Sequence, residues 1–431
     1  MKIVQLCGVI EGAGITRYLI EINNGLKDAG HEVIAFEFPE SDLSFTKEKI
    51  NNQTLPDIKL FDYSQENIDL INSADLVFVH QFVPKKIDSI YRKKFIELVQ
   101  QQITTKKALF LNDHSSTTTG FSKFYGNDIL DNYDLINSFD SLVIHCDTNT
   151  YAKKLKKLLG EELFYKKYVN LHHPHKFNDD VKKTWLDISD KHKRITYIGR
   201  WHTIKHPEQM LELKRNLKSD WEYEMRGIVR LIGLVYIPDL FYKLSDDPKL
   251  KGKKESIIGL SDLTFVPTLE WKKEQGLDKD DLLIDYKHDD KVWILGPYKR
   301  EDGMYAISKS LFGGEFYRLP EANLFGNNLE YAMHEIIEQG TIAIFDKYAC
   351  ESIEVFENGK KTGKTIADLN ICLMLDKDLN NIEQVEQQML NLMNNPNLYN
   401  DMRERAYEFI KQHCDPVSTV NTLIDDCLKN E

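Results

Sequence analysis

The chain has 431 residues, which at roughly 150 residues per domain allows two or three domains and excludes a peptide or a disulfide-stapled miniprotein. A hydrophobic content of 42% with 11% aromatic residues is typical of a folded soluble protein, and no apolar run reaches the ~18 residues of a membrane span. The net charge of −12 lies mostly in residues 186–431, because residues 1–185 carry 23 Lys and Arg against 25 Asp and Glu. A polyanionic partner such as DNA is therefore not excluded for the first half.

The first apolar stretch, residues 3–10, has only Lys2 before it and ends at Glu11, so we expect a strand there and not a secretory signal. Short apolar runs then alternate with amphipathic segments, which predicts βαβ units and a parallel sheet. The strands expected in this series are 3–10, 32–38, 75–81, 108–112 and 141–146, and the helices are 15–29, 87–102 and 149–159.

A second series of the same kind follows the polar stretch 178–194. Its expected strands are 195–199, 222–227, 292–295, 341–345 and 371–375, and its expected helices are 206–217, 304–312, 328–339 and 381–394. The last segment, 402–429, has helical spacing that Pro416 breaks. We therefore predict two doubly wound α/β domains that face a central cleft. Their predicted ranges are 1–185 together with the C-terminal helix 416–431, and 190–412 with a charged insertion at 246–290 that is compatible with a mobile loop.

The six cysteines form no CxxC pair and have no regular spacing, which is typical of reduced thiols in a cytosol. We accordingly expect a cytoplasmic protein without a disulfide framework.

The loop after the first strand contains Gly12 and Gly14 and leads into a helix. Glycines at this position let backbone N–H groups approach a phosphate at the helix N-terminus. A dinucleotide fingerprint would need a third small residue where Arg17 stands, so an NAD site is disfavoured. A tight turn without a ligand is an equally good interpretation of the loop alone.

Two cations begin the second series, because the predicted strand ends in Gly199 and Arg200 and a short loop containing Lys205 follows. Both would lie at the predicted cleft, where they could neutralise a leaving diphosphate without a metal ion. Solvated surface charge is the alternative interpretation.

The predicted helix 328–339 carries Glu330 and Glu335 and leads through Gly340 and Thr341 into a strand. A carboxylate offers two acceptor oxygens, which suits the two vicinal hydroxyls of a ribose. Asp113 and His114 follow the predicted strand 108–112, so either could orient an acceptor or stabilise charge at a sugar carbon. A side chain that caps the next helix would explain the same position.

Three further features are weaker. The sequence His172-His173-Pro174-His175 lacks an accompanying carboxylate or cysteine set, and we expect no metal there. The DxD-like triplets at 278–280 and 376–378 lie in charged loops and are interpreted as solvated. The basic cluster is more typical of a solvated helix face than of a nucleic-acid contact, although DNA binding stays open; it comprises Lys153, Lys154, Lys156, Lys157, Lys166 and Lys167.

Taken together, these segments resemble the GT-B glycosyltransferases, and more closely the DNA alpha-glucosyltransferases of T-even bacteriophages. The segments that carry the resemblance are 11–16, 113–115, 198–200 with Lys205, 308–310, 329–331 with Glu335, 340–342 and 405–409. The chain departs from that family at Asn112, where the phage enzymes have a His, and Asn327 stands where other GT-B enzymes have a Glu.

The resemblance implies a retaining transfer of a sugar from a UDP-sugar to 5-hydroxymethylcytosine, or a related base, in double-stranded phage DNA. The transfer would protect that DNA from nucleases, and the sugar would be glucose or another such as arabinose. The implied roles are the diphosphate for Arg200 and Lys205, the ribose for Glu335, the sugar for the loop at Gly12 and Gly14, and the reacting carbon for Asp113. Glu330 and Thr341 are further candidates for the donor site. We expect no obligatory metal, no membrane association, and a monomer in the host cytoplasm.

Two other functions fit the same residues. A GT-B enzyme of glycan or cell-surface polysaccharide synthesis would share the donor motifs but needs no basic face. A non-catalytic sugar-nucleotide binding protein would keep the donor site without a role for Asp113.

Overall fold

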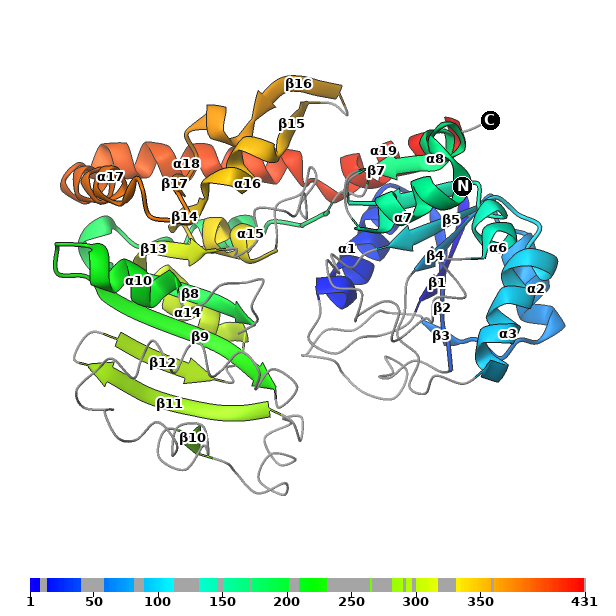
Figure 1. The fold of residues 1–431 in the computed structure, drawn as a ribbon, viewed down its shortest axis with the longest axis horizontal. Helices are drawn as coiled ribbons and strands as arrows, with labels where there is room; N and C mark the ends of the chain where they lie inside the picture. The colour runs from blue at the N-terminus through cyan, green and yellow to red at the C-terminus, as the bar shows by residue number, and fades with distance from the viewer. Residues whose placement is uncertain are drawn as a thin grey trace.

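The computed structural model describes most of the chain and has two large sheets, one in each half, the first parallel and the second mixed (Figure 1). The described residues are 1–7, 14–39, 58–80, 89–111, 132–145, 147, 150–170, 173–200, 209–230, 264–265, 281–289, 292–296, 300–316, 331–357 and 360–429. None of the helices within these ranges is long and apolar enough to cross a membrane.

The first sheet is parallel and follows the strand order β3-β2-β1-β4-β5-β6-β7. Its strands are β1 (Lys2–Cys7), β2 (Glu32–Glu37), β3 (Lys59–Leu60), β4 (Leu76–His80), β5 (Lys107–Leu111), β6 (Ser141–Ile144) and β7 (Tyr168–Asn170). The order reverses between β1 and β4, which pair in register from Ile3 with Leu76. This is the doubly wound arrangement that the alternating apolar runs predict.

Helices cover both faces of this sheet because successive strand side chains point to opposite sides. One face packs on α2 (Gln65–Asn72), α3 (Ser89–Glu97) with its π-helical extension Leu98–Gln102, α6 (Tyr133–Asn137), α7 (Thr150–Leu159) and α8 (Glu161–Lys167). The other face packs on α1 (Gly14–Asp28) and on the C-terminal helix α19 (Pro416–Lys429). The last helix of the chain therefore completes the core of the first half (Figure 1).

The second sheet follows the order β10-β11-β12-β9-β8-β13-β14-β17. Its strands are β8 (His192–Arg200), β9 (Glu222–Arg230), β10 (Thr264–Phe265), β11 (Asp281–Asp289), β12 (Val292–Gly296), β13 (Ser310–Glu315), β14 (Ile342–Asp346) and β17 (Leu373–Leu375). From β12 to β17 all neighbours are parallel, and the order reverses between β8 and β13. The second half thus repeats the winding of the first.

One face of the second sheet packs on α10 (Gln209–Asn216) and α17 (Ile382–Asn394), and the other on α14 (Arg300–Ser308), α15 (Tyr331–Glu338) and α16 (Lys347–Ser352). The long helix α18 (Pro396–His413) contributes to both cores. The remaining elements are α9 (Asp179–Lys182), the 3-10 turns Ile188–Asp190 and Ile366–Leu369, and the hairpin of β15 (Glu354–Glu357) and β16 (Lys360–Thr365).

Two sequence expectations are corrected by the structure. The predicted helix 304–312 ends at Ser308, and residues 310–315 form the buried strand β13. Within the predicted insertion 246–290, residues 281–289 form the strand β11, so a mobile loop is wrong for this part. Strand β11 pairs antiparallel with β12, which extends the sheet at its edge. The predicted helix break at Pro416 is confirmed, since α18 ends at His413 and α19 begins at Pro416.

Candidate functional site between the two sheets

Each sheet has one point at which the strand order reverses, and such points are where open α/β sheets bind ligands, at the carboxyl ends of the strands. In the first sheet the reversal lies between β1, which ends at Cys7, and β4, which ends at His80. In the second it lies between β8, which ends at Arg200, and β13. Figure 1 shows β8 and β9 pointing with their carboxyl ends toward the half that holds the first sheet.

For two of the predicted site residues, Arg200 and Gly14, the structure describes the position of the backbone alone. Arg200 is the last residue of β8, at the reversal point of the second sheet, and Gly14 is the first residue of α1. Five predicted site residues lie outside the described residues: Gly12, Asp113, His114, Lys205 and Glu330. The described strand β5 ends at Leu111, two residues before Asp113.

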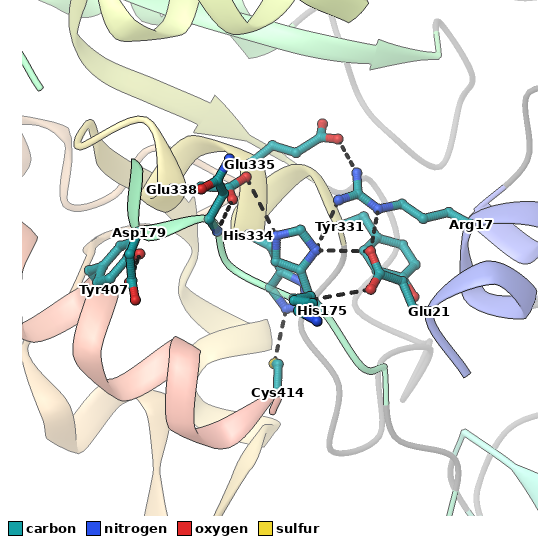
Figure 2. A network of polar contacts seen from close by, with 12 residues as sticks. Arg17, Glu21, His175, Asp179, Tyr331, His334, Glu335, Glu338, Tyr407 and Cys414 are labelled. Atoms are coloured by element: carbon teal, nitrogen blue, oxygen red, sulfur yellow. Dashed lines mark hydrogen bonds and ion pairs between the residues drawn. The ribbon is translucent and has the colours of Figure 1, made fainter. Parts of the chain in front are cut away.

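Glu335 is the predicted site residue whose surroundings are most informative. It lies on α15 and accepts a hydrogen bond from Nη1 of Arg17, which lies in the first turns of α1 (Figure 2). The exposed fractions of the two side chains are 14% and 12%, so the ion pair is largely shielded from water. The pair joins the two halves of the molecule, because α1 packs on the first sheet and α15 on the second.

His175 lies beside this pair, on the segment between β7 and β8 that connects the two sheets. Arg17 Nη2 is 2.9 Å from His175 Nδ1. When Nδ1 accepts this bond the ring proton is on Nε2, which lies 3.6 Å from Glu338 Oε2 on α15. Glu21 Oε1, from α1, lies 3.6 Å from His175 Nδ1. The imidazole therefore sits between carboxylates from both halves (Figure 2).

The charges in this cluster stabilise one another. Burial would lower the pKa of Arg17, but the carboxylates of Glu335 and Glu21 outweigh it and raise that pKa. Burial would raise the pKa of Glu21 and of Glu338, but the adjacent His175 ring, the charge of Arg17 and a backbone N–H donor to each carboxylate, from Lys176 and Asn178, lower both values. The side chains of Arg17, Glu21, His175, Glu335 and Glu338 thus form a shielded cluster of charged groups, here called the junction.

Aromatic rings surround the junction. The Arg17 guanidinium lies 4.8 Å from the ring centre of Tyr331, and that ring stacks on His173 with centroids 5.3 Å apart. His175 stacks on His334, whose Nε2 lies 3.3 Å from Cys414 Sγ at the end of α18. Burial lowers the pKa of His334 well below its usual value, so this ring stays neutral.

Thr341 is placed away from the carboxyl ends of the strands. It directly precedes β14, is buried, and its hydroxyl donates to the Ile307 carbonyl at 2.8 Å. Lys191 Nζ donates to the same hydroxyl at 3.1 Å. This position fits a structural role at the amino end of the sheet, so we leave Thr341 out of the proposed donor site.

The four predicted DNA-binding lysines lie on α7 and differ in their surroundings. Lys153 and Lys157 are exposed, and Lys154 is partly buried. Lys156 Nζ donates to Tyr165 OH at 2.6 Å and lies 3.4 Å from Asp147 Oδ2. Lys156 is therefore neutralised locally, whereas Lys153 and Lys157 present their side chains to solvent.

Sequence analysis missed the partners of Glu335. In the sequence, Arg17 stands out only as the residue that disfavours an NAD site, and His175 only as part of a weak metal motif. Glu21 and Glu338 had no distinguishing pattern. The spacing of Arg17 and Glu21, four residues apart on a helix, is a signal for a local ion pair, but nothing local points to Glu335, 318 residues away.

Within the part of the chain that the structure describes, no group of three or more His, Cys, Asp or Glu side chains is arranged to hold a metal ion. His173 and His175, two of the three histidines in the weak motif, instead contact Tyr331 and the junction carboxylates.

Three buried polar side chains, His80 on β4, Gln5 on β1 and Asn23 on α1, form a hydrogen-bonded chain near the reversal point of the first sheet. His80 Nε2 is 3.2 Å from Gln5 Oε1, and Gln5 Nε2 donates to Asn23 Oδ1 at 3.2 Å. Burial lowers the pKa of His80 to about 3, from an ordinary value of 6.5. The folded protein therefore holds this ring neutral at pH values where the unfolded chain takes up a proton.

This difference makes stability depend on pH. The contribution of His80 is complete above pH 6.5 and is lost as the pH falls toward about 3, at roughly 1.4 kcal/mol per pH unit. Between pH 7 and pH 5 we expect His80 to remove about 2 kcal/mol from the free energy of unfolding. Urea unfolding of the wild type and of His80→Gln, whose amide can still donate to Gln5, measures this. An equal loss in both proteins would contradict the assignment.

Comparisons with known proteins identify the fold. No family model matches the sequence. The chain is 24% identical over 423 residues to the DNA alpha-glucosyltransferase of Enterobacteria phage T4, which covers 94% of each chain. It is similar to a solved alpha-glucosyltransferase in complex with UDP, at 19% identity and a TM-score of 0.70, over 99% of each chain.

Two further structures share the architecture. One is an alpha-glucosyltransferase in complex with UDP and a 13-mer DNA containing an HMU base, with a TM-score of 0.69 and 19% identity over 99% of each chain. The other is HepE of Anabaena in complex with UDP and glucose, with a TM-score of 0.57 and 11% identity over 100% of this chain and 99% of that one. The chain has the GT-B glycosyltransferase fold, and the predicted fold class is confirmed.

Proposed function

We propose that the chain is a retaining glycosyltransferase that moves a sugar from a UDP-sugar onto 5-hydroxymethylcytosine, or a related hydroxymethylated base, in double-stranded DNA. The observation that carries the proposal is the similarity to a phage DNA alpha-glucosyltransferase along 94% of both chains. Similar structures that contain UDP, UDP-glucose and DNA support it. The sugar is glucose or another such as arabinose, and phage DNA in the host cytoplasm is the substrate to be protected from nucleases.

The donor belongs to the second half in this proposal. Arg200, at the reversal point of the second sheet, and Lys205, five residues on, would hold the diphosphate. Glu335 would accept the ribose hydroxyls, and the loop at Gly12 and Gly14 would cover the sugar. Residues 1–185 with the last helix would form the acceptor domain and residues 190–412 the donor domain.

The reaction exchanges one bond at the sugar carbon. The bond from C1 to the UDP phosphate oxygen breaks, a bond from C1 to the hydroxymethyl oxygen forms, and the hydroxyl proton and UDP leave. Because a primary alcohol is a weak nucleophile, positioning of the two substrates and stabilisation of the departing diphosphate supply most of the rate. Asp113 would stabilise the positive charge that develops at the sugar carbon. A base in duplex DNA must be extruded to reach such a site.

The decisive experiment incubates the protein with hydroxymethylated DNA and a panel of UDP-sugars. We expect sugar to be incorporated into the DNA, and unmodified DNA to stay unlabelled. Asp113→Ala should bind UDP normally but lose transfer. No transfer with any sugar would overturn the proposal, and UDP binding without any transfer by the wild type would favour a binding protein. Transfer to a glycan alone would favour glycan synthesis.

Exposed lysines on α7 should contribute to DNA binding through phosphate contacts. Lys153→Ala or Lys157→Ala should weaken binding uniformly across sequences and reduce the salt slope of the binding constant by about 1 each. Lys156→Ala should have less effect, because Tyr165 and Asp147 already hold its ammonium. Fluorescence anisotropy with labelled duplex at several salt concentrations measures this, with exposed Lys218 of the second half as the control. Unchanged slopes would place the DNA elsewhere.

A further inference from the structure

Glu338, the last residue of α15, is held at three of its atoms by the segment that connects the two sheets. Its Oε1 accepts a hydrogen bond from the Asn178 N–H at 2.9 Å, and its carbonyl oxygen accepts one from Trp185 Nε1 at 2.8 Å. Its Oε2 lies 3.6 Å from His175 Nε2 (Figure 2). The side chain is 9% exposed, so water competes little for these contacts. The last turn of α15 is therefore held from outside its own sheet.

The connecting segment is itself fixed to both halves of the molecule. The Lys176 N–H donates to Glu21 Oε2 on α1 at 3.2 Å. The His175 N–H donates at 2.9 Å to the carbonyl of Cys414, which directly follows α18. Through this segment, Glu338 ties α15 to a stretch of backbone that is anchored in both halves.

One side of α15 is polar and faces the connecting segment and α1. Tyr331, Glu335 and Glu338 are spaced four and three residues apart, so they lie on the same side of the helix. The Tyr331 hydroxyl donates to the Pro174 carbonyl at 3.1 Å, at the opposite end of this side from Glu338. The other side of the helix is buried in the core of the second sheet and comprises Met333, Ile336 and Ile337. Contacts at both ends of the polar side therefore fix the rotation of the helix about its axis, and with it the direction in which Glu335 projects.

We propose that Glu338 is a positioning residue that orients α15 so that the Glu335 carboxylate meets the two hydroxyls of the donor ribose. This inference rests on the proposed role of Glu335. A carboxylate offers about four acceptor positions, so Glu335 can accept the Arg17 guanidinium and both hydroxyls together. Because the ends of side chains lie about 5–6 Å from a helix axis, a rotation of about 10° would move the carboxylate by about 1 Å. A displacement of this size is enough to lose a hydrogen bond.

The test compares two nucleotides that differ only in the ribose hydroxyls, UDP and 2′,3′-dideoxy-UDP. Isothermal titration measures both affinities for the full-length wild type and its variants. The wild type should bind UDP more tightly, because only UDP can donate ribose hydroxyls to Glu335. Glu338→Ala should reduce this ratio of affinities by about 10-fold and leave the affinity for the dideoxy nucleotide unchanged. Glu338→Gln should retain part of the ratio, because its amide oxygen can still accept from the Asn178 N–H.

Glu386→Ala is the matched control. Glu386 is a buried carboxylate on α17, which packs on the other face of the second sheet from α15. It also accepts hydrogen bonds from backbone N–H groups, those of Lys218 at 3.1 Å and Ser219 at 2.6 Å. Its replacement should destabilise the second half but leave the ratio of the two affinities unchanged.

A lower ratio in Glu338→Ala, with a wild-type ratio in Glu386→Ala, supports the positioning role. A wild-type ratio in Glu338→Ala overturns it, and so does an equal reduction in both alanine variants, since loss of stability would then be the cause. In either case the wild type still discriminates between the nucleotides and the proposed function stands. A wild type that binds both nucleotides equally overturns the ribose role of Glu335 and this inference with it. A wild type that does not bind UDP overturns the proposed function itself.

Discussion

Lys205→Ala is expected to slow sugar transfer by about 10²- to 10³-fold, with little change in the free energy of unfolding. In the proposed mechanism the leaving UDP gains negative charge on its diphosphate as the C1–oxygen bond breaks. Arg200 ends β8 at the reversal point of the second sheet, and Lys205 lies five residues further on in the sequence. Removal of one of these two charged donors leaves the developing charge only partly neutralised.

The measurement is kcat with a UDP-sugar and hydroxymethylated DNA, because the loss arises in the transition state more than in substrate binding. Lys218→Ala serves as the control. In the sequence, Lys205 precedes the α10 segment and Lys218 follows it; Lys218 is exposed and pairs with Glu383 on α17. Its replacement should leave kcat unchanged. Normal turnover by Lys205→Ala would show that the diphosphate is neutralised by other groups.

Gly340→Ala is expected to destabilise the protein by about 2–5 kcal/mol. Gly340 follows α15 with φ of +63°, a left-handed conformation that costs an L-residue about 1–2 kcal/mol. A Cβ atom there would lie 2.4 Å from Cδ2 of Trp185, well inside contact distance. The indole cannot easily retreat, since its Nε1 donates to the Glu338 carbonyl at 2.8 Å.

Gly30→Ala separates the two causes. Gly30 lies in the turn that follows α1, with φ of +83°, but no atom lies within 4 Å of a Cβ built there. Only the conformational strain applies, so we expect a loss of about 1–2 kcal/mol. Urea unfolding of both variants at pH 7 tests the difference. Equal losses would mean that Trp185 moves aside at no cost.

The position of Gly340 also bears on the site. Gly340 N–H donates to the Ile337 carbonyl and Thr341 N–H to the Ile336 carbonyl, which closes the end of α15. The same helix holds Glu335 about one turn from its start, and the Trp185 indole, which follows His175 in the chain, bonds its last residue, Glu338. A weakened helix end should therefore also reduce UDP affinity.

Local sequence patterns determined the fold class and the order of most elements. Alternating apolar runs identified the central strands of both sheets, and Gly340 and Pro416 marked helix boundaries where the structure has them. These features depend on burial and on backbone geometry over a few residues, and such information is present in each segment.

Strand β13 shows where a local pattern fails. The sequence Gly313-Gly314 is typical of a turn, and the apolar spacing before it is compatible with a helix. The structure instead places Gly313 in a buried strand, where an added Cβ would lie 2.7 Å from the Ile336 side chain of α15. The glycine is needed because a helix packs closely on the strand, and the contacting residue of that helix, Ile336, lies 23 residues away in the sequence.

The candidate site divides in the same way. The sequence by itself selected Glu335 and Arg200, because a carboxylate on a helix and a cation at a strand end can each be identified within a short segment. Only the tertiary structure brought Arg17 to Glu335 and His175 between Glu21 and Glu338. A charged side chain identifies what it can bind but not which partner it meets, and here the partner is set by the docking of two independently wound sheets.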